Sequence, residues 1–468
     1  MTSPVARLGV LAAIGAAMLV SACTMGPNYK RPETPSPAAF RFVENATQAQ
    51  SLADAPWFQV FDDAALQALI EDALANNLDM KAAMARVEEA RARAGITKSF
   101  LYPQVDGAVG YTARQASDTG DNADSTAQNV SYGFQLSWEI DLFGKLRRQN
   151  ESALALTLAT EQARRGVLVT LIGDVASSYF FLRELDLQLD IAHRTLKLND
   201  ETVAYFKDRL DGGVSNRLEL DRIVALRAQT AAAIPDIERQ IALIENGISF
   251  LLARPPGAIP RQGLTMAEQL PPPIPPGLPT LLLERRPDVG QAEQLLVAAN
   301  ANIGAAKAAY FPTIGLTGFL GGVNGDLTTY LGNGAVWSFG ASLLQPVFQA
   351  GRLKHNVEAQ QARFDAALAE YQKSILNGYR EVANSLVTIQ KLALTRAEQE
   401  IGVAALVDAS DLARARYDSG LASYIEILTA DQDLFGQELL LARTRGAELR
   451  ARAELYRALG GGWQSQTP

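Results

Sequence analysis

The sequence of 468 residues contains a long internal duplication. Six positions in the region 209–220 recur 207 positions later with the same or a similar residue. The pairs are Arg209/Arg416, Asp211/Asp418, Gly213/Gly420, Leu218/Ile425, Glu219/Glu426 and Leu220/Ile427. Further upstream, three residues recur 209 positions later: Gly95/Gly304, Lys98/Lys307 and Pro103/Pro312. Because self-similarity at a fixed offset reflects a repeated architecture, we expect each half to be one structural unit that occurs twice.

Composition excludes several functional classes. The net charge is −8 and the pI about 5.1, so the chain lacks the clustered basic charge that nucleic-acid binding requires. A single cysteine, Cys23, excludes a disulfide framework and a cysteine-rich metal site. The two histidines, His193 and His355, belong to no metal-binding pair, and no phosphate-binding glycine loop occurs. We therefore predict that the protein is not an enzyme, with no catalytic residues, metal or cofactor.

The first residues have the pattern of a secretory signal peptide. Arg7 precedes an apolar run over residues 8–20, which is too short to span a membrane, and small residues lead into Cys23. The string around Cys23 resembles a bacterial lipobox, which implies an N-palmitoyl, S-diacylglycerol cysteine as the first mature residue. Thr24 follows in place of an inner-membrane retention aspartate, which favours the outer membrane. The alternative is an ordinary signal with an unmodified cysteine.

Hydrophobic periodicity changes in the same order in each half. In the first half, residues 64–101 have helical spacing, with a break near 76–77, and residues 104–114 and 130–141 alternate as strands around a polar loop. A proline-free stretch at 146–210 predicts one very long helix, and 218–252 predicts a helix that returns beside it. Pro235 is expected to kink or interrupt this returning helix.

The second half repeats this order. Its expected elements are a helix at 287–311, strands at 313–320 and 336–344, and helices at 353–418 and 421–459. A segment rich in proline and glycine separates the halves and is expected to be extended. The predicted organisation is a signal peptide (1–22), a lipidated N-terminal linker (23–61), a first repeat (62–253), a proline-rich linker (254–286), a second repeat (287–460) and a C-terminal tail (461–468).

The four amphipathic strands are too few to close a membrane barrel, for which eight is the usual minimum. Open sheet edges are not tolerated in a bilayer, so several chains would have to combine their strands, and three chains would supply twelve. Both ends of each hairpin connect to helices, which places all helices on the side that carries Cys23. The predicted fold class is an α+β membrane protein, a trimeric outer-membrane β-barrel continued by a long periplasmic α-helical barrel.

Three sequence motifs resemble those of the outer membrane efflux lipoproteins that serve resistance-nodulation-division multidrug pumps. They lie at residues 26–32 (GPNYKRP), 57–62 and 281–289 (LLLERRPDV). The resemblance extends over the whole mature length. It implies a homotrimer anchored by outer membrane lipid, with an equatorial belt formed by the linkers. It also implies docking of a periplasmic adaptor, itself attached to an inner-membrane pump, at the helical tip.

The resemblance also implies a gate where the helices turn, at residues 209–220 and 416–427. Ile425 stands at the position of a pore-facing apolar residue, and Tyr417 at that of a tyrosine that tethers neighbouring helices. Thr429 occupies the position of a pore-facing aspartate, so either an acidic ring uses Glu426, Asp431 or Asp433, or the pore is less selective for cations. The alternative is that these acids are solvated outside the coil. The two turns differ at Asn216-Arg217 and Ser423-Tyr424, a difference that we expect to decide which helices move.

We predict a passive trimeric exit duct for small molecules such as drugs, opened by its partners. The alternative is a lipid-anchored periplasmic coiled-coil scaffold without channel activity. The cargo cannot be inferred from the sequence, because selection in such systems occurs in the pump.

Overall fold

The computed structural model describes residues 24–34, 37, 63–115, 126–261, 266, 285–324 and 335–461. The predicted signal peptide, Cys23, the 57–62 motif and most of the 254–286 linker lie outside the described residues.

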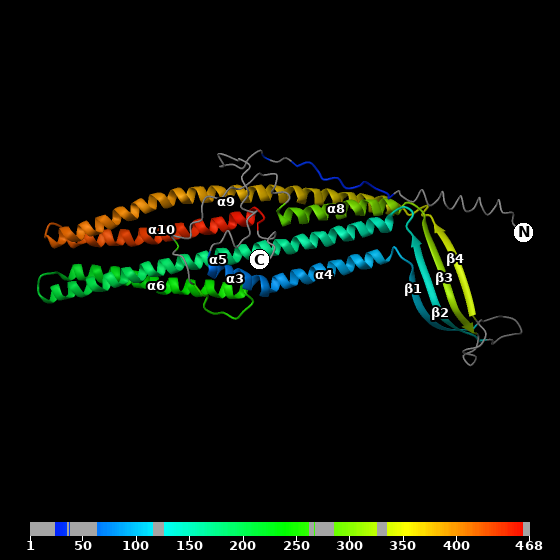
Figure 1. Cartoon of the computed structure of the whole chain (residues 1–468), viewed down its shortest axis with the longest axis horizontal. Helices are drawn as coiled ribbons and strands as arrows, with labels where there is room; N and C mark the ends of the chain where they lie inside the picture. The colour runs from blue at the N-terminus through cyan, green and yellow to red at the C-terminus, as the bar shows by residue number, and fades with distance from the viewer. Residues whose placement is uncertain are drawn as a thin grey trace, which may run out of the picture. The chain divides into compact units, whose positions relative to one another are not determined.

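The elements follow the predicted order, and the long helices of the two halves match in length (Figure 1). The first half contains α3 (Ala64–Asn76), α4 (Leu78–Ser99), β1 (Gln104–Gln115), β2 (Thr126–Ile140), α5 (Lys145–Asp211) and α6 (Arg217–Leu251). The second half contains α8 (Pro287–Ala308), β3 (Thr313–Asn324), β4 (Ala335–Leu344), α9 (Arg352–Asp418) and α10 (Tyr424–Ala458). Helices α5 and α9 have 67 residues each, and α6 and α10 have 35 each. The duplication is therefore structural.

The predicted break near residues 76–77 is confirmed, and its cause is local. Asn77 separates α3 from α4, and its side-chain oxygen accepts a hydrogen bond from the Met80 N–H at 2.9 Å, which caps the new helix. At the start of α3, Asp63 caps the N–H groups of Ala65 and Leu66. The Tyr179 hydroxyl also donates to Asp63, at 2.9 Å, and so ties this cap to α5.

The prediction that Pro235 interrupts its helix is wrong. Helix α6 continues through Pro235 from Arg217 to Leu251. Pro235 is exposed, whereas Ile234 and Ile237 beside it are buried. Water can therefore solvate the carbonyl that the missing N–H leaves free, while apolar packing on the opposite face holds the helix together.

The four strands form one antiparallel sheet in the order β1-β2-β3-β4. Strand β2 begins at Thr126 and β3 ends at Asn324, each four residues beyond the prediction. The predicted boundaries were too short because pairing with the neighbouring strand extends the ladder through residues that do not alternate between apolar and polar. The two hairpins have the same register, since Gln104 pairs with Ser137 and Thr313 with Leu344, positions related by the offsets of the duplication.

Much of the apolar face of the sheet is open, most clearly on its outer strands β1 and β4. Val109 is 78% exposed and Trp337 is 76% exposed, and the alternating aromatic positions beside them are also open. A soluble antiparallel sheet buries its apolar face, whereas a membrane barrel presents that face to lipid. The exposure therefore favours the membrane alternative over a soluble hairpin sheet.

The chain packs as two compact units, and each contains segments from both halves of the duplication. The first consists of Met1–Thr34, Ala85–Glu161 and Gln291–Gln372, and includes the sheet. The second consists of Pro35–Met84, Gln162–Gly290 and Lys373–Pro468.

The second unit has a hydrophobic core formed mainly by α3, α5 and α6. One 18-residue window of α5 has a mean hydropathy of 1.3, enough by length and composition to cross a membrane. Half of that window is buried within the protein, and Ile172, Val175 and Tyr179 are completely or almost completely enclosed. We therefore assign this apolar stretch to the core of a helical bundle.

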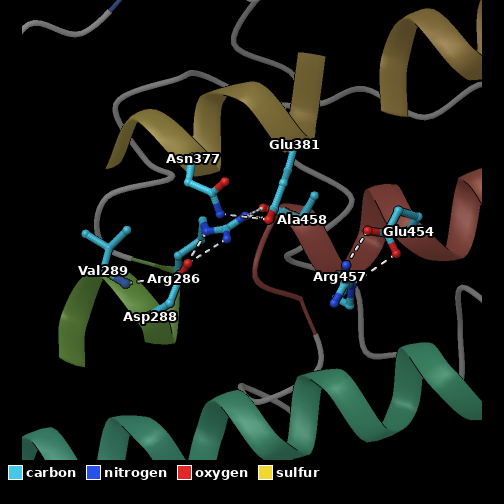
Figure 2. Close-up of polar contacts among 8 residues, drawn as sticks. All are labelled: Arg286, Asp288, Val289, Asn377, Glu381, Glu454, Arg457 and Ala458. Atoms are coloured by element: carbon cyan, nitrogen blue, oxygen red, sulfur yellow. Dashed lines mark hydrogen bonds and ion pairs between the residues drawn. The ribbon is translucent and has the colours of Figure 1, made fainter. Parts of the chain in front are cut away.

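Arg286, from the 281–289 motif, connects three helices of this second unit (Figure 2). Its guanidinium forms two hydrogen bonds with Asp288, at 2.9 and 2.7 Å, and donates to the Ala458 carbonyl at 2.8 Å. It also pairs with Glu381 at 2.8 Å. Burial alone would lower the pKa of Arg286, but the bond to Asp288 and the charge of Glu381 raise it overall. The arginine thus joins the start of α8 to α9 and the end of α10.

Replacing Arg286 with alanine is expected to destabilise the protein by about 2–3 kcal/mol, because partly buried carboxylates and a carbonyl lose a charged donor. Thermal unfolding of the detergent-solubilised protein measures the loss. Arg217→Ala is the control, because the Arg217 side chain is 86% exposed. Equal melting temperatures for the two variants would contradict this role of Arg286.

Candidate functional site: the tip of the helical hairpins

The two predicted turns share one backbone geometry. In the first, the Val214 N–H donates to the Arg209 carbonyl at 2.9 Å and the Gly213 N–H to Leu210 at 3.0 Å. In the second, Leu421 donates to Arg416 at 2.9 Å and Gly420 to Tyr417 at 2.8 Å. This pair of bonds is the Schellman motif, which requires a left-handed residue. Gly213 and Gly420 supply it, with φ of 72° and 71°.

The residues after the turns differ, as the sequence comparison indicated. In the first hairpin, the Asn216 side chain caps α6 by accepting from the Glu219 N–H at 3.0 Å. In the second hairpin, Ser423 makes no side-chain cap hydrogen bond. Tyr424, the counterpart of exposed Arg217, is buried at 8% exposure. The second returning helix thus begins with packing of an aromatic ring in place of a polar cap.

Tyr424 belongs to a hydrophobic cluster that joins the two hairpins. This tip cluster consists of Phe206, Ile223, Ala413, Tyr424 and Ile427. Phe206 and Ile223 come from α5 and α6, whereas the other three come from α9 and α10. The rings of Phe206 and Tyr424 lie 4.2 Å apart between centroids, and burial raises the pKa of Tyr424 to about 12. The hairpins therefore contact each other through apolar side chains just behind the turns.

Arg209 adds a cation to this cluster. Its guanidinium carbon lies 5.6 Å from the Tyr205 ring centroid, 5.9 Å from Phe206 and 5.6 Å from Tyr417. One amino group also donates to the Tyr205 hydroxyl at 3.0 Å. A cation over an aromatic face contributes about 0.5–2 kcal/mol, more when water is excluded. Tyr417 therefore contacts the neighbouring hairpin of its own chain, partly through Arg209.

The acidic candidates on α10 separate into two groups. Asp431 faces α9, where it accepts from the Ser410 hydroxyl at 2.5 Å and pairs with Arg414 at 2.8 Å. Its side chain is only 17% exposed. Asp433 is exposed, and Glu426 is exposed beside Arg416, with an N–O distance of 3.6 Å. Asp431 therefore holds its own hairpin together, whereas Glu426 and Asp433 remain available at the surface.

The other gate candidates also lie on the exposed side of α10. Ile425 is 43% exposed, and Thr429 is exposed with its hydroxyl donating to the Ile425 carbonyl at 2.9 Å. Residues four apart lie along one helix face, so Ile425, Thr429 and Asp433 form a continuous surface stripe. Asp211 and Asp418 are exposed at the ends of the long helices.

Sequence reasoning did not identify two features of this site. Phe206, at the centre of the tip cluster and 1% exposed, was not among the predicted residues. Arg209 was identified only as part of the turn. The signal available was the aromatic pair Tyr205-Phe206 one turn before Arg209, together with Tyr417 and Tyr424 around the second turn.

A groove of about 300 Å³ lies farther along the hairpins. Arg194 of α5 pairs with Glu438 of α10 at 2.6 Å, and the Arg414–Asp431 pair also lines the groove. In both pairs the arginine is 40–54% exposed whereas the acid is only 17–18% exposed. Among the described residues, no cluster of histidine, cysteine or acidic side chains suitable for a metal ion occurs.

The N-terminal segment, residues 24–34, is fixed to the first unit. Arg148, with a side chain 4% exposed, donates to the Met25 carbonyl at 3.1 Å and to Asn28 at 2.8 Å. Gly26, with φ of +88°, packs against Gly304 so closely that a Cβ has no room. Farther along, Glu293 receives two hydrogen bonds from Arg31, both at 2.6 Å.

The Met25 N–H donates to the Phe143 carbonyl at 3.2 Å, and Thr24 packs on Gly144, just after β2. The residues directly after Cys23 are therefore held where strand β2 leads into α5. Cys23 itself lies outside the described residues.

A four-stranded sheet with an open apolar face, continued by paired helical hairpins, matches a known family. The family model described as outer membrane efflux protein matches residues 69–254 and 278–461. The chain belongs to the outer membrane efflux protein family. This efflux protein is an outer-membrane channel component and not an enzyme.

Individual relatives support the same assignment. Cation efflux system protein CusC of Escherichia coli is 34% identical, with 96% of this chain and 97% of the relative covered. The probable outer membrane lipoprotein SilC of Salmonella typhimurium is 33% identical over 97% of this chain and 98% of its own length. The open-state structure of the Neisseria gonorrhoeae MtrE outer membrane channel has a TM-score of 0.86 and 30% identity, covering 94% of this chain and 99% of MtrE.

Replacing Phe206 with alanine should destabilise the contact between the hairpins by about 3–5 kcal/mol, because the side chain is almost fully buried. Limited proteolysis of the intact protein, followed by mass spectrometry, should show faster cleavage near the two turns. Leu218→Ala is the control, since Leu218 is 62% exposed. Unchanged cleavage in the Phe206 variant would show that the tip cluster does not hold the hairpins together.

Proposed function

We propose that three copies of this efflux protein form one channel, with twelve strands in the outer membrane and the helices in the periplasm. The proposal rests mainly on the open sheet. Strands β1 and β4 each have a strand neighbour on one side only within the described chain. Unpaired backbone groups are costly in hydrocarbon, and four strands cannot close on themselves.

We further propose that the gate lies at the helical tip and is lined by the exposed stripe of α10. Ile425 would supply an apolar constriction, and Thr429 a polar position one turn farther. Glu426 and Asp433 are the acids placed to attract cations, since three copies of an acid focus cations in a narrow pore. Asp431 is engaged by Ser410 and Arg414, so we place it outside the acidic ring.

The double substitution Ile425→Gly and Thr429→Ala should raise single-channel conductance in planar bilayers several-fold, because it widens the proposed constriction. The duplication provides a matched control. Leu218 and Arg222 occupy the equivalent positions on α6 and are also exposed. Leu218→Gly with Arg222→Ala should leave conductance near the wild-type value.

Three outcomes of the bilayer experiment distinguish the proposals. A rise in the α10 variant alone supports the gate as placed. Equal rises in both variants would show that the two returning helices line the pore equally. Absence of conductance in every variant would instead favour the scaffold without channel activity.

We also propose that Cys23 carries the N-palmitoyl and S-diacylglycerol groups. The lipobox-like sequence supports this, and the relative SilC is described as a lipoprotein. The tightly held segment after Cys23 would then keep the acyl chains close to the end of β2.

Cys23→Ala should abolish incorporation of radiolabelled palmitate, measured on the immunoprecipitated protein. Cells expressing the unchanged chain provide the positive control. Labelling that persists in the variant would place the lipid elsewhere.

As partners of the trimer we propose a periplasmic adaptor at the helical tip and, through it, an inner-membrane pump. The family membership supports this assignment. The exposed turns, with Asp211 and Asp418 at their edges, offer a polar surface for such docking.

A further inference from the structure

The duplication determines which residues should meet when two copies join their sheet edges. This inference rests on the proposed trimer and adds the register of the contact between its copies. Three strand contacts are present within the chain, namely β1 with β2, β2 with β3, and β3 with β4. The missing contact in a closed barrel is between β4 of one copy and β1 of the next.

The first and third contacts are equivalent. The pair Gln104–Ser137 becomes Thr313–Leu344 when 209 is added to the β1 number and 207 to the β2 number. The same offsets relate the helices on either side of each strand pair, since the preceding helices α4 and α8 begin 209 residues apart and the following helices α5 and α9 begin 207 apart. The two hairpins are therefore structural copies without a slip in register.

The central contact, β2 with β3, then provides a template for the contact between copies. Strand β4 corresponds to β2 and strand β1 to β3. Adding 207 to the β2 number and subtracting 209 from the β3 number converts the pair Ser137–Thr317 into Leu344–Ala108. We infer that β4 pairs with β1 of a second copy in this register, with Leu344 opposite Ala108 and Leu343 opposite Val109.

The side chains support this register independently of the arithmetic. The intrachain pair Ile140–Ile314 converts to Val347–Val105, three residues past the end of β4, so an apolar pair is retained where the strand ends. In the single chain Val347 is 93% exposed and Val105 is 61% exposed. Apolar side chains opposite each other stabilise a sheet, and this contact would be made only in the assembly.

Large and small residues also alternate across the inferred contact. On the apolar face, Phe339 would lie opposite Ala113 and Ala341 opposite Tyr111. On the other face, Ser342 would lie opposite Gly110. The lumen face would therefore be small and polar at Ser342–Gly110, with Leu344 opposite Ala108 as an apolar pair beside it.

Neighbouring registers fit less well. A slip of one residue would place the apolar side chains of one strand on the polar face of the other. A slip of two residues would place Val347 opposite Gly107 or Pro103. Gly107 offers no side chain, and proline has no N–H for the ladder.

Paired cysteines test the register directly, because Cys23 is the only cysteine of the natural chain. Two in-register double variants are Ala108→Cys with Leu344→Cys, and Val109→Cys with Leu343→Cys. Successive pairs in an antiparallel ladder alternate between close and wide Cα spacing, so these two double variants include one pair of each kind. Mild oxidation in outer-membrane fractions, followed by non-reducing gel electrophoresis, should yield covalent trimers that a reductant dissolves.

The matched control is Ala108→Cys with Ser342→Cys, which would lie on a diagonal about 7–8 Å apart. A disulfide needs Cα atoms within roughly 7 Å, so this pair should crosslink at most weakly. The single variant Leu344→Cys should give no covalent trimer. An amine-reactive crosslinker applied to every variant reports separately whether trimers are present.

Crosslinking of the diagonal pair in preference to Ala108–Leu344 would overturn the inferred register while leaving the trimer intact. Failure of all pairs in a sample where the amine-reactive reagent captures trimers would show that these edges do not pair. Loss of trimers by both methods in the unchanged chain would contradict the proposed assembly itself.

Discussion

The open edges of a four-stranded sheet are the constraint on which the rest of this structure depends. A backbone N–H or C=O without a partner costs several kcal/mol in hydrocarbon, so a sheet in the membrane must be closed. One chain supplies only β1 to β4, and both terminal strands lack one neighbour within the described residues. Closure therefore requires other copies, and the exposed apolar face of the sheet then becomes the surface toward lipid.

Much of this architecture could be predicted from the sequence because its elements are long and regular. The 67-residue helices have no helix-interrupting proline, and the strands alternate clearly between apolar and polar residues. The interruption predicted at Pro235 does not occur, because its side of α6 faces solvent and the buried isoleucines beside it hold the helix. The strand ends were also underestimated, since ladder pairing with a neighbour extends strands through residues that lack the apolar–polar alternation of the strand centres.

The candidate site was only partly predictable for a related reason. Turn residues such as Gly213 and Gly420 can be recognised in the sequence, because the left-handed conformation that ends a helix favours glycine. The contact of Phe206 with Tyr424 joins residues more than two hundred positions apart, and nothing in the local pattern of either helix specifies it. Asp431 and Asp433 are two positions apart and have the same side chain, so the local sequence does not distinguish them. Only the contacts of Asp431 with Ser410 and Arg414 do so, and these two residues come from another helix.

The two offsets of the duplication, 209 and 207, differ by two residues, and the change from one to the other falls between the first and second strand of each hairpin. Up to the end of β1 the halves are 209 residues apart, and from the paired part of β2 onward they are 207 apart. Between equivalent paired positions, the stretch from Thr313 to Leu344 is therefore two residues shorter than the stretch from Gln104 to Ser137. Since the copies diverged, chain length has changed at the tip of a hairpin, while the paired strands and the long helices kept their spacing. Loop tips are where insertions are best tolerated, which makes these connections suitable positions for an epitope that reports surface exposure in living cells.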